Sequence, residues 1–241
     1  MKGFELNKDI VLDEFSIFIK SIKTLVFGDL HIGYEESLHK SGFLLPKFHI
    51  KEMENKLAIL VRRYKPKKIV ILGDIQHDFV RPKFKVRKQI KNILDFCNNK
   101  SELILIKGNH EKLRKINMVQ GYKEHYHWLI GDYFFTHGDK LFEKTKDFKL
   151  AKNIIIGHQH PSITLYDHSR KESFKVFLSG KYKKKSLIVL PSFNLVTIGF
   201  DVLNDKIISP YIKNMRRMQV YVIGNTILDF GSVKDIITKL R

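Results

Sequence analysis

Five short segments decide the fold of this chain: Gly28-Asp29-Leu30-His31, Gly73-Asp74-Ile75-Gln76-His77, Gly108-Asn109-His110-Glu111, Thr136-His137-Gly138 and Gly157-His158-Gln159-His160. Each follows a short apolar run, such as residues 24–27, 68–72 or 103–106, that has the pattern of a buried strand. In an open α/β sheet the carboxyl ends of the strands line the ligand crevice. We therefore expect the five segments to meet in space, although they are spread over more than half of the chain.

Helical patterns separate the first apolar runs. Residues 47–64 and 86–97 repeat apolar side chains at helical spacing, and Pro66 ends the first of these helices. Further strands are predicted at 133–136 and 154–156. This alternation of strands and helices predicts a largely parallel sheet that is covered by helices.

The pattern of apolar and polar residues changes after about residue 163. Short β-branched runs separated by turns predict an antiparallel meander or a second sheet, with strands at 174–178, 186–190, 195–200, 207–212 and 219–223. The basic run 181–185 fits a hairpin turn between two of these strands. We expect one domain over residues 1–241, in which two sheets pack together with helices outside.

The composition narrows the class of protein. Of the 241 residues, 44 are Lys or Arg and 25 are Asp or Glu, so the formal net charge is +19, which favours a polyanionic partner. The single cysteine, Cys97, excludes an internal disulfide and a cysteine-rich zinc site. The N-terminus lacks an apolar signal core, and the apolar runs are far shorter than the roughly 20 residues that cross a bilayer. We expect a soluble cytoplasmic protein without a membrane partner.

The five segments carry carboxylate, imidazole and amide groups and no thiolate. Mn²⁺, Fe²⁺ and Zn²⁺ suit such a donor set. In an extended segment, Asp29 and His31 point the same way, as do His158 and His160, because side chains alternate with a period of two. A single Asp or His after a strand is more often a turn or cap residue, so it is the whole pattern that indicates a metal site.

The motifs D-x-H, G-D-x-x-H, G-N-H-E, H-G and G-H-x-H occur here in this order. In this the chain resembles the calcineurin-like metallophosphoesterase superfamily. His77 and the segment 190–194 are similar to its SbcD/Mre11-related nuclease branch. The resemblance implies a four-layer αββα sandwich, with two mixed sheets packed face to face and helices outside. The stretch after His160 is too short for the capping domain of full Mre11 nucleases, which argues against processive processing of double-stranded ends.

The resemblance also implies a site for two divalent metal ions, with Mn²⁺ foremost and Fe²⁺, Zn²⁺, Ni²⁺ or Mg²⁺ as alternatives. Asp74 would bridge the two ions. The remaining ligands would divide into Asp29, His31 and His160 for one ion, and Asn109, His137 and His158 for the other. Two such ions lower the pKa of the water between them and clamp a phosphate.

Three further residues receive roles from the same resemblance. His110 would protonate the leaving oxygen or stabilise charge on the transferring phosphoryl group. Glu111 would orient His110, or it is a favourable charge at the N-terminus of the next helix. His77 would contact the phosphate or support the metal site.

Basic residues follow two of the metal motifs closely enough to reach the rim of the site. We expect them to contact the phosphates of a nucleic acid, through Arg81, Lys83, Lys85, Lys112 and Arg114. The alternative is a merely solvated, lysine-rich surface. Trp128 is more typical of the core than of a platform on which bases stack.

The sequence therefore predicts a metal-dependent phosphodiesterase, foremost a nuclease for DNA or RNA. A small-molecule phosphodiesterase or phosphomonoesterase, acting on cyclic nucleotides or nucleotide derivatives, is the alternative. A remote third possibility is a nucleic-acid-binding protein without catalysis. The pattern leaves the native metal, the preference between DNA and RNA, and the choice between monomer and homodimer open.

Overall fold

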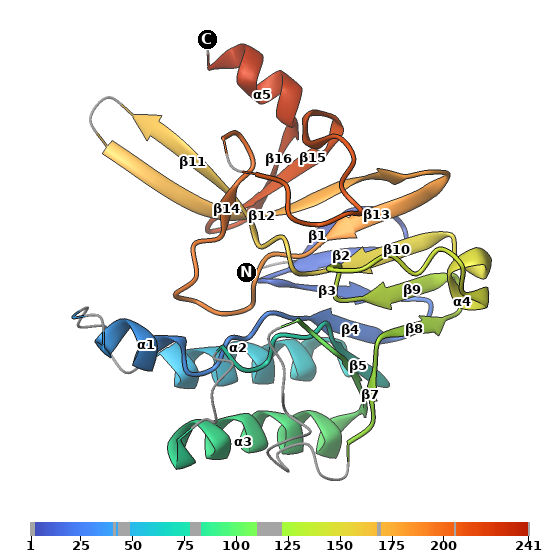
Figure 1. Cartoon of the computed structure of the whole chain (residues 1–241), viewed down its shortest axis with the longest axis vertical. Helices are drawn as coiled ribbons and strands as arrows, with labels where there is room; N and C mark the ends of the chain where they lie inside the picture. The colour runs from blue at the N-terminus through green and yellow to red at the C-terminus, as the bar shows by residue number, and fades with distance from the viewer. Residues whose placement is uncertain are drawn as a thin grey trace.

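Two mixed β-sheets pack face to face in the computed structural model, with helices on their outer sides (Figure 1). The structure describes residues 3–40, 42, 49–77, 83–109, 122–167, 170–204 and 206–240. Within these residues, no helix is both long and apolar enough to span a bilayer.

The first sheet has seven strands that follow one another in chain order. They are β1 (Phe4–Glu5), β2 (Ile10–Asp13), β3 (Ser16–Ile19), β4 (Thr24–Phe27), β5 (Lys68–Ile71), β6 (Glu102–Ile106) and β7 (Glu124–His125). Pairing is antiparallel from β1 to β4 and parallel from β4 to β7. The connection from β4 to β5 runs through the short α1 (Tyr34–Lys40) and α2 (His49–Tyr64), and the connection from β5 to β6 runs through α3 (Phe84–Lys100).

The second sheet has the strand order β14-β11-β12-β13-β10-β9-β8, and a hairpin of β15 and β16 pairs with β12. Its strands are β8 (His127–Ile130), β9 (Tyr133–Thr136), β10 (Asn153–Ile156), β11 (Pro161–Asp167), β12 (Arg170–Tyr182), β13 (Lys185–Val189), β14 (Phe200–Asp201), β15 (Gln219–Ile223) and β16 (Ile227–Ser232). β10 is parallel to both β9 and β13. The helices α4 (Lys146–Leu150) and α5 (Val233–Lys239) belong to this half.

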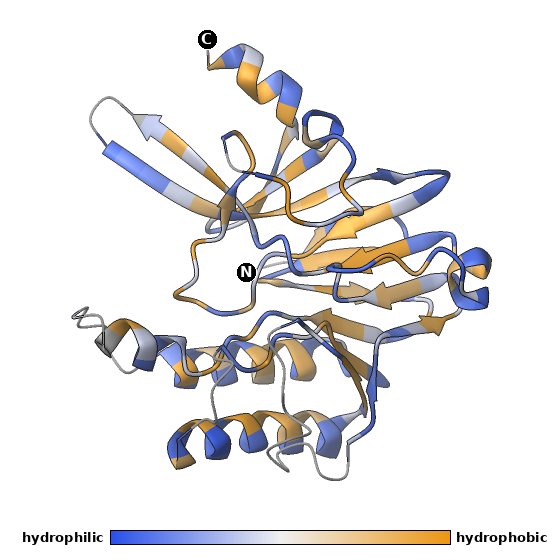
Figure 2. Cartoon of the chain, in the orientation of Figure 1, coloured by the Kyte–Doolittle hydropathy of each residue, from blue (hydrophilic) through white to orange (hydrophobic). Residues whose placement is uncertain are grey.

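Three apolar clusters lie between the four layers. The first cluster lies between the outer face of the first sheet and the helices α2 and α3, and it includes Ile69, Leu57 and Ile90. The inner faces of the two sheets share a second cluster that includes Val70 and Ile155. The third cluster covers the outer face of the second sheet with α4, α5 and residues of the segments 202–204 and 206–218. Hydrophobic residues accordingly follow the strands, whereas α2 and α3 alternate between hydrophobic and hydrophilic residues (Figure 2).

Several features differ from the sequence-based expectation. The parallel strands do not form one sheet, because β9 and β10 join the second sheet rather than the first. Three antiparallel strands at the N-terminus, β1 to β3, were not predicted.

Two predicted strands are absent from the described residues. Residues 195–200 and 207–212 are irregular apart from Phe200 in β14. Side chains satisfy their backbone instead of a neighbouring strand: Asn194 Oδ1 accepts bonds from the Val196 and Thr197 amides, and Gln159 Oε1 accepts from those of residues 208 and 209. Local bonds of this kind compete with a β-ladder, and apolar periodicity alone does not reveal them.

Other expectations are confirmed. The hairpin turn lies between Tyr182 and Lys185, with Lys183 in a left-handed conformation at φ 55°. Trp128 packs against the cluster between the sheets. Cys97 is buried on α3, and this burial raises the pKa of its thiol to about 12.

Candidate metal centre

The five motif segments meet at one edge of the two packed sheets. They follow β4, β5, β6, β9 and β10, whose carboxyl ends lie together. Backbone hydrogen bonds join the segments: the Asp29 amide donates to Gly73 O at 3.0 Å, and the His31 amide donates to Asp74 O at 2.9 Å. The Gly157 amide donates to His137 O at 2.9 Å. The convergence predicted from the sequence is therefore present, and it draws on both sheets.

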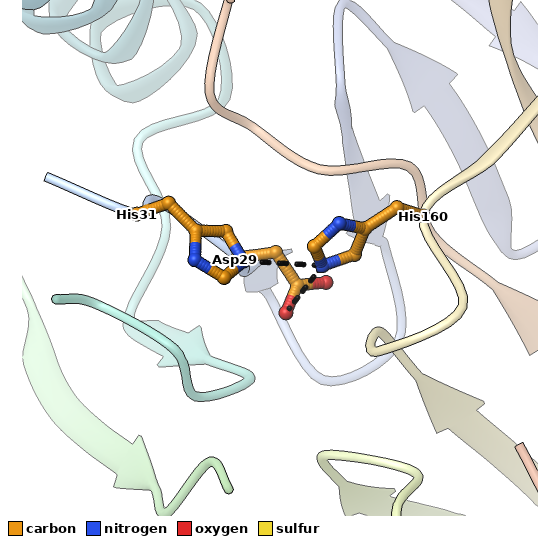
Figure 3. Close-up of side chains that lie close together, drawn as sticks. All are labelled: Asp29, His31 and His160. Atoms are coloured by element: carbon orange, nitrogen blue, oxygen red, sulfur yellow. Dashed lines mark hydrogen bonds and ion pairs between the residues drawn. The ribbon is translucent and has the colours of Figure 1, made fainter. Parts of the chain in front are cut away.

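Asp29, His31 and His160 form the first group of ligating side chains (Figure 3). The His31 and His160 Nε2 atoms are 3.3 Å apart, and His160 Nε2 lies 3.3 Å from Asp29 Oδ1. Two ligands that each lie about 2.1 Å from a shared ion are separated by roughly 3.0–3.5 Å. The observed spacings match this, so one divalent ion fits the group.

Asp74, His137 and His158 form the second group. His137 Nε2 is the point on which its neighbours converge, at 3.1 Å from His158 Nδ1 and 3.4 Å from Asp74 Oδ2. Asn109 Oδ1 lies 2.9 Å from the same nitrogen. Asn109 thus lies beside the second group.

Asp74 faces both groups. Its Oδ2 atom is 3.4 Å from His137 Nε2 and 3.9 Å from His31 Nε2. Both carboxylates of the centre, Asp29 and Asp74, are buried. A carboxylate in this position can coordinate one ion with each oxygen, or both ions with one. The geometry therefore fits the bridging role expected for Asp74.

Neighbouring backbone groups orient these ligands. His137 Nδ1 donates to Leu72 O at 2.7 Å, which turns Nε2 toward the second group. The His158 amide donates to Asp29 Oδ2 at 2.9 Å. Asp29 Oδ1 is buried and forms no regular hydrogen bond among the described residues, although His160 Nε2 lies 3.3 Å away. A buried carboxylate oxygen beside ring nitrogens that can ligate a metal is the kind of atom that a cation satisfies.

The local backbone differs from the extended form that the D-x-H pattern suggested. Asp29, His31, Asp74, His158 and His160 all have positive φ angles, between 41° and 63°. Residues with side chains seldom adopt this left-handed region, and each such residue costs on the order of 1 kcal/mol or more. The paired ligands converge through these turns rather than through strand alternation.

Two glycines allow the ligand loops to approach one another. A Cβ atom on Gly108 would overlap Asp74 Oδ1, and one on Gly157 would overlap Asp29 Oδ2. These positions require glycine because another part of the metal centre occupies the space of a side chain.

Burial and charge set the protonation of the ligands. Burial lowers the pKa of His31 to about 3, reinforced by His160, and it lowers the pKa of His158 to about 4, reinforced by His137. Burial alone would raise the pKa of Asp29, but His160 and His137 hold it below its ordinary value. Burial disfavours charged His137 too, yet Asp74 and Asp29 raise its pKa to about 10. The two carboxylates thus hold a positive charge at the point where a cation would bind.

Comparison with known proteins agrees with this geometry. A family model for calcineurin-like phosphoesterases matches residues 22–199. The chain belongs to the calcineurin-like phosphoesterase family. No curated protein matches it.

Two solved structures illustrate what this phosphoesterase is similar to. Pseudomonas putida nuclease MPE is 16% identical with a TM-score of 0.65, and the match covers 95% of this chain and 99% of that chain. Yfce, a phosphoesterase from E. coli, is 15% identical with a TM-score of 0.38, covering 70% of this chain and 79% of that chain. The first likeness confirms the two-sheet sandwich as the family fold.

The other predicted site residues of the phosphoesterase are only partly described. His77 lies beside His31, with ring centroids 5.6 Å apart, and its ring is 4.5 Å from that of Tyr34. Lys83 and Lys85 are exposed at the start of α3, and Lys83 Nζ lies 3.4 Å from Glu36 on α1. Five predicted residues fall outside the described residues, namely Arg81, His110, Glu111, Lys112 and Arg114.

The sequence analysis noted residues 190–194 only for their resemblance to the nuclease branch and missed that this segment, after β13, supports the ligands. Ser192 Oγ donates to Asp29 O at 2.6 Å, and Asn194 Nδ2 donates to Leu30 O at 2.7 Å and to His31 O at 3.3 Å. Lys175 Nζ in turn donates to Ser192 O and Asn194 O. We call residues 192–194 the support segment. The sequence contained the pattern that would have predicted this role. It is the pattern used for the other loops, namely polar residues directly after an apolar strand at the same sheet edge.

Proposed function

We propose that this phosphoesterase is a two-metal phosphodiesterase that cleaves nucleic acid. The observation that supports it most is the pair of ligand groups on either side of Asp74, with Asp74 Oδ2 3.4 Å from His137 Nε2 and 3.9 Å from His31 Nε2. Calcineurin-like phosphoesterases use a pair of divalent ions, and each group offers a place for one.

The residues of the centre would bind the two metal ions as follows. Asp29, His31 and His160 would hold one ion, while Asn109, His137 and His158 would hold the other, with Asp74 between them. Bound ions of this kind supply a water of lowered pKa and offset the charge of a phosphate. Leu72 O keeps His137 in the tautomer that leaves Nε2 available as a ligand.

Substrate orientation falls to residues at the edge of the centre. His77, whose ring lies beside that of His31, would donate a hydrogen bond to a phosphate oxygen. His110 remains our sequence-based candidate for protonating the leaving oxygen, and Glu111 for orienting His110; both lie outside the described residues.

Two considerations favour nucleic acid over a small phosphoester. The net charge of +19 suits a partner with many phosphates, because such binding rests on many lysine and arginine contacts. A solved structure that aligns with 95% of this chain is named a nuclease. The native metal is proposed to be Mn²⁺, which carboxylate, amide and imidazole ligands suit.

The test compares three substrates with Mn²⁺ present and after its removal with a chelator. Bis-p-nitrophenyl phosphate reports diester hydrolysis, p-nitrophenyl phosphate reports monoester hydrolysis, and a single-stranded oligonucleotide reports nuclease activity. We expect metal-dependent turnover of the diester and of the oligonucleotide. Turnover of the monoester alone would contradict the proposal.

Asp74→Asn should lower kcat on the order of 1,000-fold while the fold persists, since it removes the shared carboxylate. Asp132→Asn is the matched control, because Asp132 is half exposed and pairs with Lys152 at the surface. Equal activity of the two variants would show that Asp74 does not hold the metals.

A further inference from the structure

An exposed tyrosine lies next to the second ligand group and has no part in the metal centre. Tyr126 connects β7 to β8, and its residue surface is 56% exposed. β8 pairs with β9 so that His127 lies opposite Thr136, and Tyr126 and His137 are the next residues beyond this pair on the two segments. Thr136 Oγ1 donates to Tyr126 O at 3.2 Å and thereby fixes the backbone of this corner.

Lys107 approaches the same ring from the first sheet. Its Nζ atom is 5.2 Å from the centroid of the Tyr126 ring. The Lys107 amide donates to His125 O at 2.7 Å, and Lys107 precedes the ligand Asn109 by two residues. Tyr126 and Lys107 are thus each anchored to backbone that also carries a ligand of the second group.

The surroundings of this pair are basic. Lys123 is exposed near His125, whose pKa is lowered by burial and then by Lys123. Within the part of the chain that the structure describes, no carboxylate lies within ion-pair distance of Lys107 or Lys123. Among the described residues, a phosphate would therefore meet the positive charge of Lys107 and Lys123.

A purely structural role explains Tyr126 poorly. Its neighbour Trp128 packs into the cluster between the sheets, whereas Tyr126 belongs to none of the three apolar clusters. Exposed aromatic rings beside lysines are the combination with which proteins hold single strands, since a base stacks on the ring and the phosphates meet the charge.

We propose that Tyr126 and Lys107 form a subsite for one unpaired nucleobase and its phosphate, adjoining the metal centre on the Asn109 and His137 side. The ring of Tyr126 stacks on the base, and the ammonium group of Lys107 contacts the flanking phosphate. This inference rests on the proposed function and narrows its substrate to single-stranded DNA or RNA.

The test measures kcat/KM for a single-stranded oligonucleotide relative to kcat/KM for bis-p-nitrophenyl phosphate, which has no base. Tyr126→Ala should lower this ratio about 10- to 100-fold, the range that loss of one base–aromatic stack gives. Tyr126→Phe and Tyr126→Trp, which keep a ring, should stay within about threefold of the wild type. Tyr166→Ala is the matched control, since Tyr166 is 66% exposed on β11.

Two further arms distinguish stacking from a general loss of fit. An abasic nucleotide beside the cleaved phosphate should reduce wild-type cleavage to the level of Tyr126→Ala, and it should have little further effect on that variant. A duplex of the same sequence should be insensitive to Tyr126→Ala, because its bases are paired. Lys107→Met should make the slope of log kcat/KM against log salt shallower by about 0.7.

The outcomes separate this subsite from the nuclease proposal. Oligonucleotide cleavage with the same ratio in the wild type, Tyr126→Ala and Tyr166→Ala would overturn the subsite and leave the nuclease proposal standing. Hydrolysis of the small diester without cleavage or binding of any oligonucleotide would overturn both. Parallel DNA and RNA strands decide which nucleic acid the subsite accepts.

Discussion

Asn194→Ala tests whether the support segment holds the first ligand group in place. The side chain is buried and makes four hydrogen bonds. Nδ2 donates to the carbonyl oxygens of Leu30 and His31, and Oδ1 accepts from the amides of Val196 and Thr197 at 2.8 and 3.2 Å. Alanine removes both halves of this link between two loops.

The expected size follows from these bonds. A hydrogen bond contributes about 1 kcal/mol net to stability, and a buried partner left without one adds to the loss. Four bonds therefore give a decrease of about 4 kcal/mol in the free energy of unfolding. Because His31 O is one of the released atoms, Mn²⁺ affinity should fall by about 10- to 100-fold, as is typical when groups behind metal ligands are removed.

Urea unfolding in the presence of a chelator measures the first quantity, and calorimetric titration with Mn²⁺ measures the second. Asn214→Ala is the control, since Asn214 caps only the short 3₁₀ turn Met215–Arg217 through one bond to the Arg216 amide. It should cost about 1 kcal/mol and leave Mn²⁺ affinity unchanged. A loss below about 1 kcal/mol in Asn194→Ala, with wild-type metal affinity, would refute this account of the support segment.

Three other predictions concern the same region. Burial lowers the pKa of Lys175 to about 7, from an ordinary 10.5, so the unfolded chain binds more protons than the folded chain between these pH values. The unfolding free energy of the wild type relative to Lys175→Met should therefore rise by up to about 1.4 kcal/mol per pH unit from pH 7 to 10. A difference that does not change with pH in urea titrations would contradict this. Calorimetric titration should show that Gly157→Ala abolishes Mn²⁺ binding to the first group, because the new Cβ would overlap Asp29 Oδ2. Gly224→Ala is the control, since its Cβ would meet only Thr226 O at 3.7 Å, and it should leave Mn²⁺ binding unaltered. Removing metal with a chelator should lower the unfolding free energy by about 2.7 kcal/mol relative to Mn²⁺ at 100 times its Kd; an identical Tm with and without chelator would show that the folded chain binds no metal.

The chemistry of the centre was readable in the chain because it depends on residue type and order. Asp29, Asp74, His137 and His160 each follow an apolar run, and strands with parallel neighbours deliver their carboxyl ends to one edge. The helices α2 and α3 were predictable for the same local reason, since their apolar side chains recur at helical spacing.

Other features depended on contacts between distant residues. Strand periodicity says nothing about the partner of a strand, so the transfer of β9 and β10 to the second sheet could not be foreseen. Residues 207–212 have the pattern of a strand, but Gln159 takes two of their backbone amides. The left-handed turns at Asp29 and His158 likewise arise where two loops press together, because the folded neighbours rather than local preference stabilise them.

The linear chain thus defined which atoms can ligate a metal and roughly where each strand ends. The packing of the two sheets determined which ligating side chains lie together, and it brought Asn194 behind His31 and Lys107 beside the ring of Tyr126. The type of ligand is a property of each side chain by itself. The layers come together only when the three apolar clusters are buried, and only then do residues more than a hundred positions apart lie about 3 Å from one another.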